Sequence, residues 1–277
     1  MTGIWGIVNV TTDSFSDGGR YLDPDRAIAH GLELRDAGAT VLDVGGESTR
    51  PGAERVDPAV EEQRVIPVIT ELAARGIAVS VDTLNASTAA AAVGAGARIV
   101  NDVSGGLADP DMLAAVAASG ADYAIGHWRG PSDDMYARAD YLRPSREVAG
   151  ELRERIGEAA AAGIAPSRII LDPGIGFAKA GAQNWDVLRG LGDITALGYR
   201  VLIGTSRKRF LVETLRAAGA DPTAASGSGA EDVSVERRDL ATAVTSALAV
   251  RHDVWAVRVH DVAATRDALA IAHAWEG

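Results

Sequence analysis

The feature that most constrains the fold is an alternation of short β-branched runs with segments of helical pattern along the whole chain. This alternation is typical of βα units, in which each strand pairs in parallel with the next. The apolar runs are bounded by turn residues, and we count eight of them: residues 4–8, 40–44, 77–81, 98–103, 123–127, 169–172, 200–204 and 256–260. Eight repeats predict an α/β fold in which the sheet closes on itself.

The chain length agrees with a single (β/α)8 TIM barrel. Such barrels take roughly 250 residues, and this chain has 277, of which 47% are hydrophobic and 23% charged. We therefore expect one domain over residues 1–277, with the active site at the C-terminal ends of the strands. The longest irregular stretch, residues 217–235, is rich in Gly, Ser and Ala. It predicts a mobile loop, since a further βα unit follows it.

Helix boundaries support the same division of the chain. The pairs Asp23-Pro24, Asp57-Pro58 and Asp109-Pro110 predict helix starts, because Asp is a good N-cap and Pro suits the first turn. Glycines suited to a left-handed turn predict where helices end: Gly38, Gly76, Gly120, Gly163 and Gly198.

The net charge and the absence of cysteine exclude several classes of binding partner and of chemistry. A net charge of −11 gives no electrostatic footprint for nucleic acid or for an anionic membrane, so an anionic substrate must be captured locally. The absence of cysteine excludes disulfides, thiolate metal sites and cysteine nucleophiles. The N-terminus lacks the pattern of a signal peptide, and no apolar run is long enough to span a membrane. We expect a cytoplasmic enzyme with small-molecule substrates.

Polar residues stand at or near the ends of most predicted strands. Parallel strands of a barrel point the same way, so these residues are expected to ring one mouth. Each alone could be a turn former, but seven together favour a site: Asn9, Asp43, Asp82, Asn101, His127, Asp172 and His260.

Four segments carry a resemblance to a known family. They are residues 9–19 after the first strand, 43–53 after the second, 204–210 after the seventh and 258–261 at the eighth. Together with residues 80–83, 101–102 and 171–174, they resemble the dihydropteroate synthases, which are pterin-binding TIM barrels. The sequence is most similar to actinobacterial members of that family. The resemblance implies a homodimeric transferase of folate biosynthesis that uses Mg²⁺. It would condense 6-hydroxymethyl-7,8-dihydropterin diphosphate with 4-aminobenzoate to give 7,8-dihydropteroate and pyrophosphate.

The chemistry of a pterin matches residues at the strand ends. A pterin edge offers adjacent N–H donors and a carbonyl, which a carboxylate and an amide can match. Asp172 and Asn101 are the candidates, with Lys208 reaching the ring carbonyl or N5. The resemblance adds Phe177 and Gly204 to the substrate-binding set.

A diphosphate leaving group needs cationic partners. Arg258 and His260 are expected to hold it, with Mg²⁺ near Asn9. Positive charge on the exocyclic carbon can spread into the pterin ring, so the diphosphate can depart ahead of amine attack. Asp82 is then expected to stabilise the cation, and no protein nucleophile is needed.

The resemblance implies that the first two loops build the 4-aminobenzoate site. Phe15 would cover the aromatic ring, Thr49 and Pro51 would line it, and Asp17 would pair with Arg50 to gate the loops. The predicted helix start at residues 206–210, which includes Arg209, can bind any anion at its N-terminus. Anion chemistry alone does not decide between phosphate and carboxylate, whereas the resemblance assigns this helix start to the carboxylate of 4-aminobenzoate.

Three positions depart from the family pattern. Thr12 replaces a usual Pro, Arg209 a common Ser, and Gly126 a Met that precedes His127. We expect the missing Met side chain to leave an empty space against the pterin, so that Gly126→Met would strengthen pterin binding. His127 itself is expected to support the site rather than to react.

Three other functions remain open from the residues. A corrinoid methyltransferase would share Asp82, Asn101 and Asp172 but not the diphosphate loops. A Schiff-base aldolase would use Lys208 as an imine former. A paralogue that binds pterin without turnover is the third alternative, and pyrophosphate release separates it from an active synthase.

Overall fold

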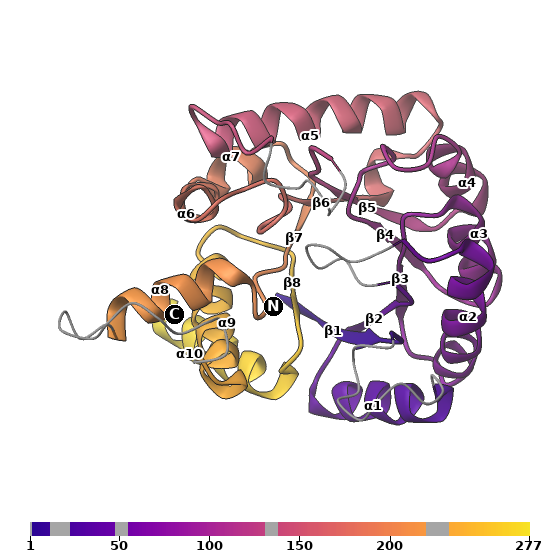
Figure 1. Ribbon diagram of the computed structural model, residues 1–277, viewed down its shortest axis with the longest axis horizontal. Coiled ribbons are helices and arrows are strands. Elements are labelled where there is room, and N and C mark those ends of the chain that lie inside the picture. Colours follow the sequence, from indigo (N-terminus) through magenta and orange to yellow (C-terminus); the bar gives the residue numbers. More distant parts are fainter. Residues whose placement is uncertain (1, 12–22, 48–54, 131–137, 220–232) are drawn as a thin grey trace.

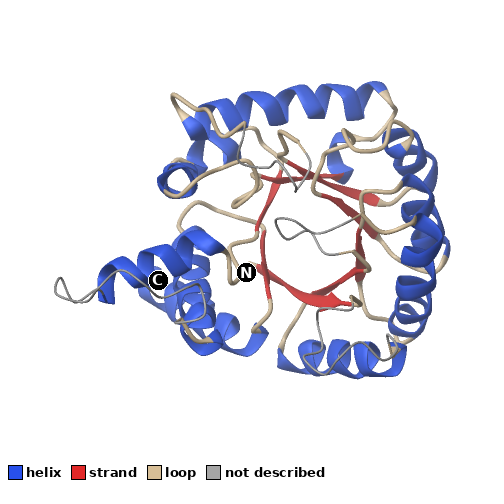
Figure 2. Cartoon of the chain, viewed as in Figure 1, coloured by secondary structure: helices blue, strands red, loops and turns tan. Residues whose placement is uncertain are grey.

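The computed structural model describes residues 2–11, 23–47, 55–130, 138–219 and 233–277 (Figure 1). Eight parallel strands form a closed barrel in the order β1 to β8, and β1 pairs with β8 to close it. Figure 2 shows the strands as a ring with helices around its outside. The predicted eight-stranded α/β barrel is confirmed. The strands are β1 Gly3–Asn9, β2 Val41–Gly45, β3 Val79–Asp82, β4 Ile99–Asp102, β5 Asp122–Gly126, β6 Ile169–Asp172, β7 Arg200–Ile203 and β8 Ala256–Val259.

The described helices lie between the strands and after the last one. They are α1 Pro24–Ala37, α2 Pro58–Ala74, α3 Ala86–Gly94, α4 Met112–Ser119, α5 Pro144–Ala161, α6 Ala182–Arg189, α7 Leu191–Thr195, α8 Arg209–Gly219, α9 Val235–Val250 and α10 Val262–Glu276, with a short 3-10 helix η3 at Pro166–Arg168. Helix α8 continues to Gly219, so the irregular stretch begins later than the predicted residue 217. Residues 220–232 of the predicted loop lie outside the described part of the chain.

Two of the three predicted helix starts are correct. The side chains of Asp23 and Asp57 accept hydrogen bonds from Asp25 N and Ala59 N at the starts of α1 and α2. The five predicted glycine stops all have left-handed φ angles, between 76° and 116°.

The prediction for Asp109 is correct only in part. Helix α4 begins later than predicted, at Met112, but Asp109 Oδ1 still accepts a hydrogen bond of 3.0 Å from Asp111 N, while its Oδ2 accepts one of 2.8 Å from Ala86 N, the first residue of α3. The expected cap of α3, Asn85, makes no side-chain capping bond. Asp109 therefore caps a neighbouring helix across the fold, a choice that local sequence cannot reveal.

A small cluster fills the barrel interior beneath the mouth. It takes one residue from each of seven strands: Trp5, Val41, Ile99, Ala124, Ile170, Leu202 and Ala256. Because side chains alternate between the two faces of a strand, the residue two positions further along points to the same, inner face. That next layer contains Asp43, Asn101, Asp172 and Arg258, and Ser80 is followed in the same way by Asp82. An apolar floor thus carries a layer of charged and amide groups.

Candidate active site

Arg258 is the centre of the polar layer. Its Nε lies 2.5 Å from Asp43 Oδ2, and one terminal nitrogen lies 2.7 Å from Asp82 Oδ2. Asn101 Nδ2 donates to the same Asp43 oxygen at 3.0 Å. The four residues come from β8, β2, β3 and β4, so barrel closure brings them together. These two bonds use two of the five N–H donors of the guanidinium, which therefore keeps donors to offer an anion.

Burial sets the charge states of this network. Burial raises the pKa of the Asp82 carboxyl to about 7, although the nearby Arg258 guanidinium opposes that rise. Burial alone would lower the pKa of Arg258, but the carboxylates of Asp43 and Asp82 outweigh it and raise the value. The arginine thus stays charged, and Asp82 titrates close to neutral pH.

Asp43 is a residue that our sequence analysis placed at the mouth but gave no role. Its side chain is fully buried, and its Oδ1 has no hydrogen-bond partner among the described residues. A buried carboxylate oxygen without a donor can accept a hydrogen bond from a water or from a ligand N–H. The signal for this role was present in the sequence, because Asp43 belongs to the set of polar strand ends.

Asp172, Lys208 and Arg258 converge around Gly204. A Cβ atom at Gly204 would lie 3.9 Å from both Lys208 Nζ and Arg258 Cβ, and 4.0 Å from Asp172 Oδ2. The ammonium of Lys208 lies 4.8 Å from the ring centroid of Phe177 and donates to Ile175 O. The structure therefore brings together four residues that the sequence proposed for the pterin, counting Gly204 itself, with Arg258, which it proposed for the diphosphate.

The two charged groups of this pterin set shift in opposite directions. Burial raises the pKa of Asp172, against the opposing charge of Lys208. Burial also lowers the pKa of Lys208 to about 8, and here the Asp172 carboxylate opposes the shift. Each group thus limits the shift of the other. Asp172 Oδ1 also accepts a 2.8 Å hydrogen bond from Gly174 N, which orients the carboxylate.

His260 lies at the end of β8, next to the β7–α8 loop. Its Nδ1 is 2.8 Å from Ser206 Oγ, and its backbone N–H donates to the same hydroxyl at 3.1 Å. Arg209, the first residue of α8, pairs with Glu213 at 2.8 Å and is largely exposed. The backbone of this loop is held by Arg207, which forms two hydrogen bonds to Asp239.

Asn9 ends β1 opposite Gly45 of β2 and is partly exposed at the mouth. No group of three or more His, Asp or Glu residues suited to a metal ion occurs within the described ranges. Phe15, Asp17, Thr49, Arg50 and Pro51, like Thr12, lie outside the described residues.

The expectation of an empty space at Gly126 is wrong. A Cβ atom there would lie 2.4 Å from Val103 Cα and from Val103 O, much closer than an ordinary contact. The backbone after β4 crosses the position that a side chain would occupy. Glycine is required at this position by a close approach of two backbone segments, and there is no cavity for a Met to fill.

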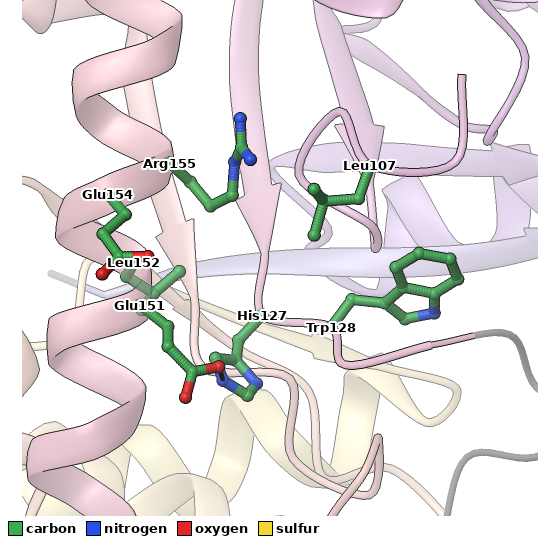
Figure 3. Close-up of a pocket in the computed structure, with 7 residues that line it drawn as sticks. All are labelled: Leu107, His127, Trp128, Glu151, Leu152, Glu154 and Arg155. Carbon is green, nitrogen blue, oxygen red and sulfur yellow. Dashed lines mark hydrogen bonds and ion pairs between the residues drawn. The ribbon is translucent and has the colours of Figure 1, made fainter. Parts of the chain in front are cut away.

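His127 is buried, and its ring points toward Glu151 of α5 (Figure 3). Its Nε2 is 2.9 Å from Glu151 Oε2, and its Nδ1 is 3.0 Å from Lys179 Nζ. The ring borders a small cavity of about 160 Å³ that Trp128, Leu152 and Arg155 also line. These contacts agree with a supporting role for His127. Lys179 is not among the residues predicted from the sequence, and the signal that points to it is the rarity of lysine in this chain.

A model of the family described as pterin binding enzyme matches residues 5–260. The fold and the convergent pterin set agree with this match. The class that they define is that of the pterin-binding TIM-barrel enzymes.

Relatives narrow the class. A dihydropteroate synthase of Mycobacterium leprae is 51% identical over 98% of this chain and 92% of that protein. The structure of Xanthomonas albilineans dihydropteroate synthase with 4-aminobenzoic acid is 40% identical, with a TM-score of 0.87, over 100% of this chain and 93% of that one. The Xanthomonas albilineans enzyme in complex with 7,8-dihydropteroate is 38% identical, with a TM-score of 0.84, over 100% and 94%. The chain belongs to the dihydropteroate synthase family.

Proposed function

We propose that this protein catalyses the dihydropteroate synthase reaction of folate biosynthesis. It joins 6-hydroxymethyl-7,8-dihydropterin diphosphate to 4-aminobenzoate and releases pyrophosphate. The observation that carries this proposal is the convergence of Asp172, Lys208 and Arg258 around Gly204, because this constellation offers an acceptor for pterin N–H groups and cations beside it. Solved relatives that hold 4-aminobenzoic acid or 7,8-dihydropteroate support it.

The pterin ring is bound by the inner layer of the barrel. Asp172 accepts the adjacent N–H donors of the aminopyrimidinone edge, and Asn101 supplies an amide on a neighbouring side. Lys208 donates to the ring carbonyl or N5, and its ammonium already lies over the Phe177 ring. Asp43 Oδ1, buried and without a described partner, offers one further acceptor for a pterin N–H.

Arg258 and His260 hold the diphosphate in this proposal. The two carboxylates beside Arg258 keep its guanidinium charged and fix its orientation, so its remaining N–H donors are aimed without further loss of side-chain freedom. His260, which directly follows β8, is held by Ser206. Both groups stabilise charge that develops on the leaving oxygen.

Asn9 fits the metal that the family implies. Mg²⁺ keeps several waters and takes only one or two protein oxygens together with substrate phosphates. The Asn9 amide oxygen, partly exposed at the end of β1, is a ligand of that kind. Mg²⁺ bound there would place positive charge next to the phosphate oxygens.

Asp82 is the anion nearest to the developing cation in this proposal. As the bond from carbon to the diphosphate oxygen breaks, positive charge spreads over the pterin ring, and an ionised Asp82 stabilises it. The arylamine nitrogen then forms the new bond to carbon and loses one proton. The Arg258 guanidinium beside Asp82 lowers its pKa against the effect of burial, and so favours the ionised form.

The 4-aminobenzoate site follows from the resemblance alone. Phe15, Thr49 and Pro51 would line it, and the start of α8 with Arg209 would receive its carboxylate. Asp17 and Arg50 would pair across the two loops and close them. These assignments stay predictions, because the loop residues lie outside the described part of the chain.

A homodimer that acts in the cytoplasm completes the proposal. Large apolar side chains stand exposed on α9 and α10, among them Leu248 (53% exposed), Ile271 (71%) and Trp275 (89%). Contiguous apolar surface of this kind is typical of an interface between protein chains. Within the described residues, no helix is long and apolar enough to cross a membrane.

Pyrophosphate release from the pterin diphosphate tests the function directly. Release that depends on 4-aminobenzoate is the expected result. Release without the arylamine contradicts coupled transfer, and pterin binding without release indicates a silent paralogue. Trapping with borohydride and a carbonyl substrate would label Lys208 only if the protein were an aldolase.

A further inference from the structure

Lys179 carries an ammonium group buried beneath the pterin site, in the loop between β6 and α6. Its side chain is only 1% exposed. Its Nζ lies 3.0 Å from each of three acceptors, namely Gly174 O, Phe177 O and His127 Nδ1. Burying a charge costs free energy unless the charged group is fully hydrogen-bonded. The three acceptors therefore offset the cost of burying the Lys179 ammonium.

The acceptors match the protonated form of the lysine. The Glu151 carboxyl has its pKa lowered to about 2, because hydrogen bonds from His127 and Arg129 outweigh its burial. Glu151 is therefore an acceptor and His127 Nε2 is the donor to it. Burial lowers the pKa of His127 to about 4, so the ring is neutral and its Nδ1 accepts from Lys179. An ammonium has three N–H donors for these three acceptors, whereas a neutral amine has only two.

The loop that Lys179 holds has no regular structure of its own. Gly174, Gly176 and Ala178 all have positive φ angles, at 62°, 84° and 49°. Gly174 packs so closely on β5 that a Cβ there would lie 2.2 Å from His127 O. A backbone of this kind keeps its shape only where its surroundings fix it. Two of its carbonyls are fixed by the Lys179 ammonium.

The same loop carries two residues of the proposed pterin site. Asp172 precedes it and accepts a hydrogen bond from Gly174 N, and Phe177 lies within it with its ring near Lys208 Nζ. Lys179 donates to the carbonyl groups of Gly174 and Phe177 themselves. Lys179 thus bonds directly to the backbone of the segment that carries both proposed pterin contacts.

The small number of lysines in the chain agrees with a specific role for Lys179 beside the pterin site. The 277 residues contain only two lysines, Lys179 and Lys208, against 25 arginines. The other cationic side chains are all arginine, whose wide planar fork differs from a compact ammonium with three donors. Both lysines stand around Asp172, and their charges lower its pKa against the effect of burial.

We propose that Lys179 is a positioning residue for the pterin site. Its buried ammonium ties the Gly174 and Phe177 carbonyls to His127, and so holds Asp172 and Phe177 in the geometry that binds pterin. The inference rests on the proposed function, since it assumes that the loop contacts a pterin. The groups that face Lys179 are His127 at the end of β5, Asp172 of β6, Lys208 of the β7–α8 loop, Glu151 of α5 and Arg129 of the β5–α5 loop.

Lys179→Met tests this proposal, because Met fills a similar volume without donors or charge. Calorimetry with 6-hydroxymethylpterin, which lacks the diphosphate, should show about tenfold or greater loss of affinity in the folded variant. The KM for 4-aminobenzoate at saturating pterin diphosphate should stay unchanged. Ser145→Ala removes a hydrogen bond to Asp193 between outer helices and controls for general destabilisation. Unchanged pterin affinity in folded Lys179→Met overturns the proposal.

The pH dependence separates positioning by the ammonium from simple packing. Burial lowers the pKa of Lys179 to about 7, so its third donor is lost as the pH rises through that value. The ratio of wild-type to Lys179→Met affinity should therefore shrink between about pH 6 and pH 9. A ratio that does not change with pH contradicts a role for the charge.

A measurement on the wild-type protein covers the case in which Lys179→Met does not fold. Protein labelled with ¹³C-lysine gives two side-chain signals, and Lys208→Arg assigns them. Pterin should raise the titration midpoint of Lys179, because binding and protonation favour the same loop geometry. A Lys179 titration midpoint that does not change when pterin binds overturns the inference. If wild-type protein binds pterin but releases no pyrophosphate, the proposed function fails while the positioning result stands.

Discussion

Gly126→Ala should destabilise the protein and weaken pterin binding. The new Cβ would lie 2.4 Å from Val103 Cα and from Val103 O, whereas ordinary contacts begin at 3.4 Å. The overlap is with backbone atoms, which cannot rotate away as a side chain would. Either the end of β5 or the segment after β4 must move, and overpacking of this kind costs about 1–3 kcal/mol. We expect the upper end of that range, because no flexible group relieves the overlap.

This loss of stability converts into a measurable temperature shift. For a chain of this size, a loss of about 3 kcal/mol lowers the Tm by roughly 6–12 °C. Pterin affinity should fall as well, because Gly126 pairs with Asp172 and the next residue, His127, donates its N–H to Asp172 O at 2.9 Å. A shift of β5 therefore reaches the carboxylate that binds the pterin edge. Gly126→Met should behave in the same way with a larger effect.

Differential scanning calorimetry and pterin titration check both effects, with Gly157→Ala as the matched control. Gly157 lies in the interior of α5, and a Cβ atom added there would meet no described atom within 4 Å outside its own helix turn. Alanine there should stabilise the helix by about 0.5–1 kcal/mol. If Gly126→Ala keeps the wild-type Tm and pterin affinity, then Val103 relaxes freely and our reasoning from the close contact is refuted.

Three further changes test the site and the surface. Asp172→Asn should leave the protein folded but lower pterin affinity at least tenfold, since an amide cannot accept two ring donors; calorimetry with an unchanged Kd would contradict this. The kcat/KM for the pterin diphosphate should fall as the pH drops below about 7, because burial raises the pKa of Asp82 to about 7 and protonation removes its charge; a rate profile flat from pH 5 to 8 would contradict a required Asp82 carboxylate that titrates near pH 7. Trp275→Glu should turn a dimer into a monomer in sedimentation, because a charge would replace an 89% exposed apolar side chain at the proposed interface; a dimer that persists would place the interface elsewhere.

The sequence by itself determined the barrel and the position of its mouth. Each strand is indicated by a local run of β-branched residues, and most strands then end in or near a polar residue such as Asp82 or Asp172. Both signals are local, so they can be detected without knowledge of the neighbours. The period of two along a strand also fixes which residues share the inner face once the barrel is assumed.

Only the tertiary structure decided which of these groups pair. Arg258 bonds to Asp43 and Asp82, which stand 215 and 176 residues earlier in the chain. Asp109 also caps the neighbouring helix α3, and Val103 fills the space in front of Gly126. Lys179 is surrounded by acceptors from two segments that no sequence pattern brings together. Contacts, burial and the pKa shifts that follow from them depend on closure of the barrel, because closure brings side chains from distant segments within hydrogen-bonding distance and removes them from water.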